Sequence, residues 1–159
     1  MGELFTNQAE YLPLIKDRLI DFIRVHMSDI GGLTPCIKLA SLCEFFGVKL
    51  ALHGPGDTSP IGMAANLAID YTFANHGIQE WHVDHLGASG DSKNVINKIF
   101  SGVIEVKDGC AWANDKPGWG IDINEEEAAK YPWPEDVRLG SNPCLWPAVR
   151  AEDGSIIYP

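Results

Sequence analysis

The sequence predicts an α/β fold made of parallel βα units, because helical and extended patterns alternate along its first half. Helical spacing of apolar residues and short apolar runs follow one another over residues 8–81, in the order helix, strand, helix, strand, helix, strand. The runs are mostly apolar, which is typical of a parallel sheet covered on both faces. After about residue 82 the alternation stops, and four of the five Trp gather there with many Gly and Pro. We therefore expect a tail of different structure after the βα units.

The first helix and strand are predicted from residues 8–27. Leu12, Ile15 and Leu19 recur at helical spacing within residues 8–19. Residues 21–27 form a short, mostly apolar run that predicts a strand.

The second helix is expected to follow the break at residues 31–32. Thr34 is its predicted N-cap, Pro35 its first helical residue and Gly47 its end. Residues 48–53 then predict the second strand. The expected inward face of this helix comprises Ile37, Ala40, Leu42 and Phe45 or Phe46.

The third helix and strand follow the loop at residues 53–57. Ser59 before Pro60 is again a cap followed by proline, and it predicts a helix over residues 60–73. Residues 77–81 predict the third strand.

The tail contains two local signals. Asp108-Gly109 between two short strand-like segments predicts a β-hairpin. Residues 124–131 predict a short helix, with Asn124 as cap and acidic residues in its positive first turn.

Composition and charge limit the classes of protein. The 159 residues suffice for one domain, and 45% hydrophobic with 21% charged residues is ordinary for a globular chain. The net charge of −10 disfavours nucleic acid as a partner. The apolar runs are too short for a membrane span, and the N-terminus lacks the order of a signal peptide. We therefore expect a cytoplasmic protein without nucleic-acid or membrane partners.

The cysteines support the same location. Cys36, Cys43, Cys110 and Cys144 form no CxxC pair and no zinc-type cluster. They are expected to be reduced and buried, as small hydrophobic side chains.

Polar residues follow the predicted strands at the points where these strands end. They are Arg24 and His26, then His53 and Asp57, then Glu80. In βα barrels the carboxyl ends of the strands carry the chemistry, so this clustering predicts a site. Three βα units cannot close such a barrel, which usually needs about 200 residues or more. Either the sheet is open or the sequence is part of a longer protein, and the start of the chain, close to a strand end, favours a part.

The residues also resemble a known family. GELF at the start, the stretch from IDFIRVHM through HGPGD to NLAID, GIQEW, and later KDGCAWANDKPGWGIDINEEEAAKYPW are similar, in this order, to the C-terminal part of the mannonate dehydratases. That family includes the starvation-sensing proteins and belongs to the enolase superfamily.

The resemblance implies a fold and a division of the chain. The family folds as a (β/α)7β barrel with a capping domain. Residues 1–86 would be the last strands and helices of the barrel, and residues 87–159 a Gly/Pro/Trp-rich tail with a β-hairpin that packs on barrel and cap.

The resemblance also implies a reaction. Family members use Mg²⁺ to dehydrate D-mannonate or D-gluconate to 2-keto-3-deoxy-D-gluconate. Glu3 matches the third metal ligand, and Arg24, His53, Asp57 and Glu80 match positions that contact the substrate. Carboxylates suit a hard cation, which stabilises the enediolate formed when the proton beside the sugar-acid carboxylate is removed. The other metal ligands and the catalytic acid and base would lie upstream of this chain, so no catalytic residue is assigned and the isolated chain is expected to be inactive.

Each candidate has a purely structural alternative. For Glu3 the alternative is an ordinary glutamate at a frayed N-terminus, although the resemblance favours the metal ligand. For Arg24 the alternative is one half of a structural ion pair. For His53 the alternative is a hydrogen-bonded structural role at the strand end. For Asp57 it is capping the turn before Pro60, and for Glu80 it is exposure to solvent or a simple ion pair.

Two further histidines were considered as metal ligands. His82 and His85 have metal-like spacing, although Asp84 and Gly87 indicate a surface loop instead. For the whole chain, the alternatives to a dehydratase segment are a non-catalytic partial barrel that self-associates as a homo-oligomer or complements another chain, and a sugar-acid binding module.

Overall fold

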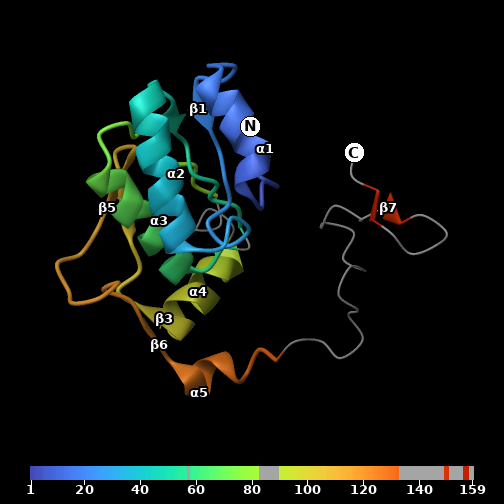
Figure 1. Cartoon of the computed structure of the whole chain (residues 1–159). Coiled ribbons are helices and arrows are strands. Elements are labelled where there is room, and N and C mark those ends of the chain that lie inside the picture. Colours follow the sequence, from blue (N-terminus) through green and yellow to red (C-terminus); the bar gives the residue numbers. More distant parts are fainter. Residues whose placement is uncertain (57, 83–89, 133–148, 151–155, 158–159) are drawn as a thin grey trace. The chain divides into compact units, whose positions relative to one another are not determined.

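The computed structural model describes residues 1–56, 58–82, 90–132, 149–150 and 156–157 (Figure 1). The chain divides into two compact units, Met1–Asn124 and Glu125–Pro159. The predicted boundary between barrel and tail at residues 86–87 stays a prediction.

Parallel pairing between neighbouring βα units organises the first unit. Strand β1 (Phe22–Ile23) pairs in parallel with β2 (Lys49–Leu50), with Phe22 opposite Lys49. The pairing extends beyond the regular strands, since the His53 N–H donates to the Val25 carbonyl at 3.0 Å. A third segment joins through a parallel bridge between Leu50 and His76. The predicted parallel order is therefore present.

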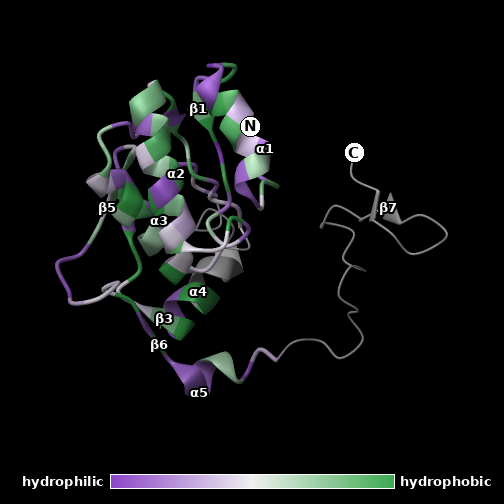
Figure 2. Ribbon diagram, viewed as in Figure 1, coloured by the Kyte–Doolittle hydropathy of each residue, from purple (hydrophilic) through white to green (hydrophobic). Residues whose placement is uncertain are grey.

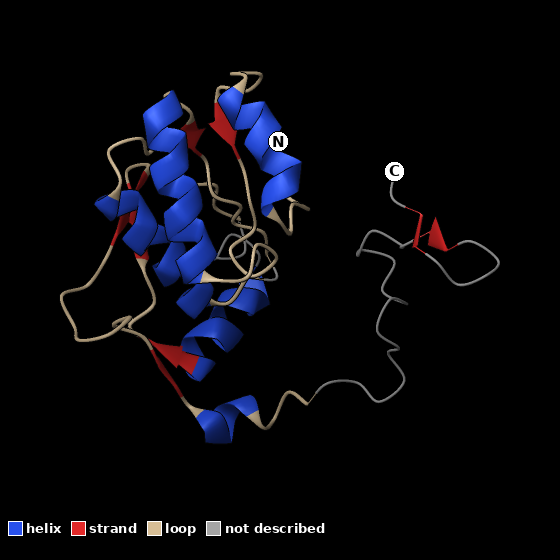
Figure 3. Ribbon diagram, in the orientation of Figure 1, coloured by secondary structure: helices blue, strands red, loops and turns tan. Residues whose placement is uncertain are grey.

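The regular strands are much shorter than the runs 21–27, 48–53 and 77–81 that predict them (Figure 3). The third run contains no strand, and only the bridge at His76 precedes it. One cause is visible at Gln79, whose side-chain amide donates to the Leu52 carbonyl at 3.0 Å. A side chain thus uses an acceptor that a neighbouring backbone N–H would take in a regular ladder.

Helix α1 (Gln8–Lys16) begins at a capping box. The Asn7 side chain accepts from the Ala9 N–H at 2.9 Å, and the Glu10 carboxylate accepts from the Asn7 N–H at 2.9 Å. The helix ends before the predicted residue 19 because Arg18 takes a left-handed conformation, with φ of 54°.

Helix α2 (Leu33–Phe46) ends as predicted at Gly47, which has φ of 66° and donates to the carbonyls of the last turn. Its start differs from the prediction. Gly32 is the N-cap, and no side chain caps the helix, so Thr34 lies within the first turn.

The buried face of α2 also differs from the predicted one. Ala40 is buried as expected, whereas Ile37 is 42% and Phe45 90% exposed. Hydrophobic residues surround much of this helix, so helical periodicity alone does not select its inner face (Figure 2). The residues that it buries are Cys36, Leu39, Ala40 and Cys43.

Helix α3 (Pro60–Thr72) confirms the predicted cap. The Ser59 hydroxyl accepts from the Gly62 N–H at 3.2 Å, and Pro60 is the first helical residue.

The predicted hairpin is present, with β4 (Glu105–Lys107) antiparallel to β5 (Cys110–Trp112). Asp108 and Gly109 have φ of 53° and 75°, as a two-residue turn with left-handed backbone requires. The Tyr71 hydroxyl donates to the Ala111 carbonyl at 3.3 Å, so the hairpin lies against α3 (Figure 1). Between α3 and the hairpin in sequence, α4 (Gly90–Ile99) leads into β3 (Phe100–Ser101). Strand β3 pairs antiparallel with β6 (Asp122–Ile123), which follows the hairpin.

Among the described residues of the first unit, two hydrophobic clusters hold the elements together. The larger one lies between α1, α2 and the parallel segments and includes Ile15, Ile23, Leu39 and Leu50. The smaller one joins α3 to the segment before the hairpin through Met63, Ala64, Leu67 and Ile104.

The cysteines are only partly as predicted. Cys36 and Cys43 are buried, and burial raises the pKa of each thiol to about 12. Cys110 is exposed, contrary to the prediction, because it lies on the hairpin. Cys144 lies outside the described residues.

The second unit has little regular structure in its described part. It contains the short helix α5 (Glu125–Ala128) at the predicted place, and β7 (Val149–Arg150) antiparallel to β8 (Ile156–Ile157). Among the helices that the structure describes, none is long and apolar enough to cross a membrane.

Candidate functional site

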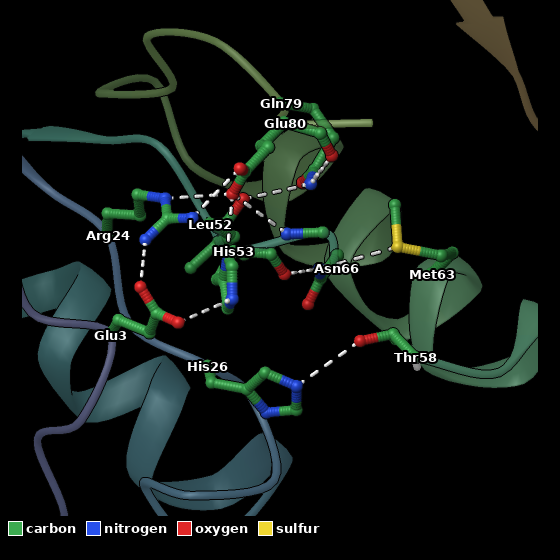
Figure 4. Close-up of polar contacts among 11 residues, drawn as sticks. Glu3, Arg24, His26, Leu52, His53, Thr58, Met63, Asn66, Gln79 and Glu80 are labelled. Carbon is green, nitrogen blue, oxygen red and sulfur yellow. Dashed lines mark hydrogen bonds and ion pairs between the residues drawn. The ribbon is translucent and has the colours of Figure 1, made fainter. Parts of the chain in front are cut away.

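Four ionisable side chains meet where the parallel segments end. Arg24 follows β1, His53 follows β2, and Glu80 follows the segment that begins at His76. Glu3 comes from the N-terminal segment, which lies beside β1 because the Arg24 N–H donates to the Met1 carbonyl at 2.8 Å. Figure 4 shows the four side chains pointing toward one another.

Arg24 connects two carboxylates. Its Nε and Nη2 donate to the two oxygens of Glu80, each at 2.8 Å, and its Nη1 donates to Glu3 Oε2 at 2.6 Å. The Glu80 contact is bidentate, which a planar guanidinium makes best. A guanidinium has five N–H groups, so two remain for another acceptor.

His53 contacts the same two carboxylates from the other side. Its Nδ1 lies 2.6 Å from Glu80 Oε2, and its Nε2 lies 3.3 Å from Glu3 Oε1. The ionised Glu80 can only accept, so Nδ1 carries a proton and Nε2 is the nitrogen that faces Glu3. The His53 side chain is 7% exposed, and its backbone carbonyl accepts from the fully buried Asn66 amide at 2.9 Å. The ring is therefore held in one place.

The electrostatics favour an ionised Glu80. Burial raises the pKa of Glu80, but hydrogen bonds from Arg24, His53 and the Gly54 N–H outweigh it and lower that pKa to about 2. The hydrogen bonds to Glu80 raise the pKa of Arg24, against the effect of its own partial burial. The cluster is thus a set of opposite charges that stabilise one another.

His26, which follows the same predicted strand as Arg24, lies in the same region. Its ring centroid lies 5.5 Å from that of His53, in an edge-on arrangement, and its Nε2 lies 3.2 Å from the Thr58 hydroxyl. Its Nδ1 lies 2.6 Å from the Ser28 hydroxyl. The sequence signal that places His26 beside Arg24 is strand periodicity. Residues two apart share one face of a strand, and Arg24 precedes His26 by two.

The four described candidates Glu3, Arg24, His53 and Glu80 are therefore together, and for Arg24, His53 and Glu80 this is what the clustering at strand ends predicted. The fifth, Asp57, lies outside the described residues, and so does His85 of the His82/His85 pair. The roles of all five in substrate or metal binding stay predictions.

The described residues do not by themselves fit a Mg²⁺ site. Within the described part of the chain, no group of three or more His, Cys, Asp or Glu side chains is placed to hold a metal ion. The carboxylates of Glu3 and Glu80 both face Arg24 and His53, whose donors occupy oxygens that a hard cation would need.

Comparison with known proteins identifies the family. The family model of the enolase C-terminal domain-like proteins matches residues 1–128. The chain belongs to this family. Its predicted enolase-superfamily α/β fold is thereby confirmed, whereas a (β/α)7β barrel and a tail packed on a capping domain stay predictions.

Individual relatives show which members of this family the chain resembles. A D-galactonate dehydratase family member of Pantoea ananatis is 46% identical over all 159 residues, which correspond to 35% of the relative. One of Enterocloster bolteae is 45% identical, with 36% of its length covered. The chain thus spans about a third of the length of these relatives.

A solved structure supports the same relationship. A crystal structure of an enolase from Pantoea ananatis with bound D-gluconate and Mg superposes with a TM-score of 0.75. It is 50% identical and covers 84% of this chain and 30% of that one. The relatives named here are D-galactonate dehydratase family members, so the narrower assignment to mannonate dehydratases is not supported by these comparisons.

Proposed function

We propose that this chain forms one wall of the active site of a Mg²⁺-dependent sugar-acid dehydratase. In this proposal Arg24, His53, Asp57 and Glu80 contact the sugar acid, and Glu3 supplies one oxygen ligand to the metal. The meeting of Glu3, Arg24, His53 and Glu80 at the ends of the parallel segments carries the proposal. The likeness to an enolase that binds D-gluconate and Mg supports it.

The proposed reaction removes water from D-mannonate or D-gluconate and forms 2-keto-3-deoxy-D-gluconate. The two N–H groups of Arg24 that the carboxylates leave open can donate to a carboxylate or hydroxyl oxygen. Because Glu80 holds the proton on His53 Nδ1, His53 Nε2 can hydrogen-bond a sugar hydroxyl when Glu3 turns toward a metal. These residues bind and orient the substrate, and no proton-transfer role is assigned to them.

The same geometry supports the expectation that the 159-residue chain is inactive alone. Glu3 offers a single carboxylate, and the remaining metal ligands would come from outside the described residues. We expect no keto acid from D-mannonate, D-gluconate or D-galactonate in a semicarbazide assay with Mg²⁺. Keto-acid formation by the purified chain would contradict this part of the proposal.

A chimera tests the binding roles directly. The matching segment of the Pantoea ananatis relative is replaced by this chain, and D-gluconate binding is measured by calorimetry with and without Mg²⁺. We expect Mg²⁺-dependent binding that Glu3→Gln and Arg24→Met each weaken by about tenfold or more, since each removes a charged contact. The control is Asp115→Asn at an exposed position, which should leave binding unchanged. Wild-type affinity in both site variants would refute the assigned roles.

A second candidate function is non-catalytic. In this alternative the chain self-associates as a homo-oligomer or completes another chain through exposed apolar side chains. Phe45 is 90% and Ile37 42% exposed on α2, and Leu19 is 66% exposed after α1. Exposed apolar surface of this kind favours association. A cytoplasmic location remains part of the proposal for either function.

A further inference from the structure

His26 connects two loops beside the candidate site. It lies in the loop between β1 and α2, two residues after Arg24. Its Nε2 lies 3.2 Å from the hydroxyl of Thr58, which lies between β2 and α3 (Figure 4). The His26 side chain is only 16% exposed, so this contact is largely shielded from water. One hydrogen bond therefore ties the loop before α2 to the loop before α3.

Both ring nitrogens of His26 are used within the chain. The Ser28 backbone N–H, which can only donate, lies 3.2 Å from Nδ1, and the Ser28 hydroxyl lies 2.6 Å from the same nitrogen. The Asp29 carboxylate is farther from Nδ1, at 3.7 Å. Nδ1 is therefore an acceptor, and the proton is on Nε2, which donates it to the Thr58 oxygen. With both nitrogens bonded in this way, His26 is suited to holding other groups in place and not to binding a substrate.

The member of the ionisable cluster that His26 contacts is His53. The two ring centroids are 5.5 Å apart and the ring planes make an angle of 67°, which is a favourable edge-on arrangement. Ser28 and Thr58 fix the His26 ring from its two sides. A fixed ring at this distance limits how far the His53 ring can tilt.

His53 exchanges one of its contacts when it takes up the proposed role. In the described structure its Nδ1 contacts Glu80 and its Nε2 contacts Glu3. A substrate hydroxyl at Nε2 would take the place of Glu3, and the hydrogen bond to Glu80 alone allows the ring to tilt about it. The edge of His26 restricts this motion and keeps Nε2 directed at the hydroxyl, and such preorganisation favours binding.

We propose that His26 is a positioning residue of the sugar-acid site. Tied to Thr58, it holds the His53 ring at the angle from which Nε2 meets a hydroxyl of the substrate. This inference rests on the proposed function, because it assumes that His53 contacts the sugar acid. Its first step, from Thr58 through His26 to His53, needs no substrate and is tested separately.

Thr58→Val tests the first step in the full 159-residue chain. Valine has nearly the shape of threonine but cannot accept the His26 proton, and both rings stay in the protein. Two-dimensional NMR follows the imidazole signals, and we expect those of His53 to shift or broaden as its ring loses support. The matched control is Thr72→Val near the end of α3, where the Thr72 hydroxyl donates to the Ala68 carbonyl at 2.6 Å. Changes at His53 no larger than in this control would overturn the proposal.

The second step is tested in the chimera with the Pantoea ananatis relative, by calorimetry with D-gluconate and Mg²⁺. We expect His26→Ala to weaken binding about three- to tenfold and Thr58→Val about two- to fivefold. In a His53→Ala background, His26→Ala should weaken binding further by less than about twofold, because its effect acts through His53. Thr72→Val should leave binding unchanged in either background.

The double-variant comparison separates positioning from a general structural role. Equal losses from His26→Ala with and without His53 would refute the proposal. Circular dichroism verifies the fold of each variant, and Thr58→Val takes the place of His26→Ala in the comparison if the latter does not fold. A chimera that fails to bind D-gluconate with His26 intact refutes the proposed function and with it this role. Normal binding by that chimera, together with unchanged affinity in His26→Ala, refutes only the role of His26.

Discussion

Arg24 donates three hydrogen bonds to carboxylates that lie 21 and 56 residues away in the sequence. It therefore joins the N-terminal segment, β1 and the segment after His76 at one point. Its side chain is 32% exposed, so the contacts are partly protected from solvent. This makes Arg24 a structural link in addition to its proposed role in binding the substrate.

We expect Arg24→Lys to lower the free energy of unfolding by about 1–3 kcal/mol, because an ammonium cannot make the bidentate contact with Glu80. Urea unfolding at pH 7 measures the change. The control is Arg18→Lys, since Arg18 donates one hydrogen bond to the Phe46 carbonyl at 2.6 Å and should lose less. An equal loss in both variants would show that the bidentate contact contributes nothing.

The low pKa of Glu80 makes stability depend on pH. Its pKa is about 2 in the folded protein against an ordinary value of 4.5, so ionised Glu80 stabilises the fold above about pH 4.5. This contribution disappears as the pH falls from 4.5 toward 2. With allowance for solvent screening at a side chain that is 39% exposed, it amounts to about 1–2 kcal/mol.

We expect Glu80→Gln to be less stable than the wild type by that amount at pH 7, and the difference to shrink below about pH 4.5 and approach zero only near pH 2. Urea unfolding across this pH range measures it. The exposed Glu44, which has no ion pair among the described residues, gives the control Glu44→Gln, with a change below about 0.5 kcal/mol. A difference for Glu80→Gln that is constant with pH would contradict the assignment.

Much of the candidate site could be predicted at the level of residues. Parallel strands in sequential order place their carboxyl ends together, so Arg24, His53 and Glu80 were expected to meet. The individual contacts were not predictable, because which carboxylates Arg24 and His53 contact depends on angstrom-scale placement of the side chains.

Helix boundaries show which local signals are reliable. The Ser59-Pro60 pair and Gly47 act as their sequence predicts, because cap chemistry and left-handed backbone are local properties. Thr34 has the same kind of signal as Ser59, yet Gly32 takes the cap position of α2. The preceding turn continues into the helix there, since the Gly32 carbonyl already accepts from the Cys36 N–H at 3.2 Å.

This difference between the two helices is testable. We expect Ser59→Ala to destabilise the protein by about 0.5–2 kcal/mol, because the Gly62 N–H loses its acceptor. Thr34→Ala should change stability by less than about 0.5 kcal/mol, since Thr34 is exposed and caps nothing. Thermal unfolding of both variants measures this. A loss at Thr34 as large as that at Ser59 would restore the sequence-based assignment of the cap.

The exposed apolar side chains of α2 bear on whether the whole molecule self-associates. Ile37 and Phe45 lie eight residues apart and therefore near one face of the helix, where they are 42% and 90% exposed. A monomer gains nothing from such a surface, whereas a second chain could cover it.

We expect the purified chain to form dimers or larger species at about 100 μM, a concentration at which modest apolar contacts hold. Light scattering measures the mass. Ile37→Ser combined with Phe45→Ser should shift the protein toward monomer. The control Trp119→Ser removes a residue that is 43% exposed on a loop and should leave the mass unchanged. A wild-type monomer at this concentration would count against self-association.

The sequence by itself determined the order of the βα units, the caps at Ser59 and Gly47, the hairpin turn and the set of charged residues at the strand ends. These follow from local backbone preferences and from the period of apolar residues, which neighbours along the chain impose. Only the tertiary structure decided which face of α2 is buried, how short the regular strands are, and that one arginine and one histidine share the same two glutamates. Those outcomes depend on contacts between segments tens of residues apart, where packing and hydrogen bonding select among arrangements that the local sequence leaves equal in energy.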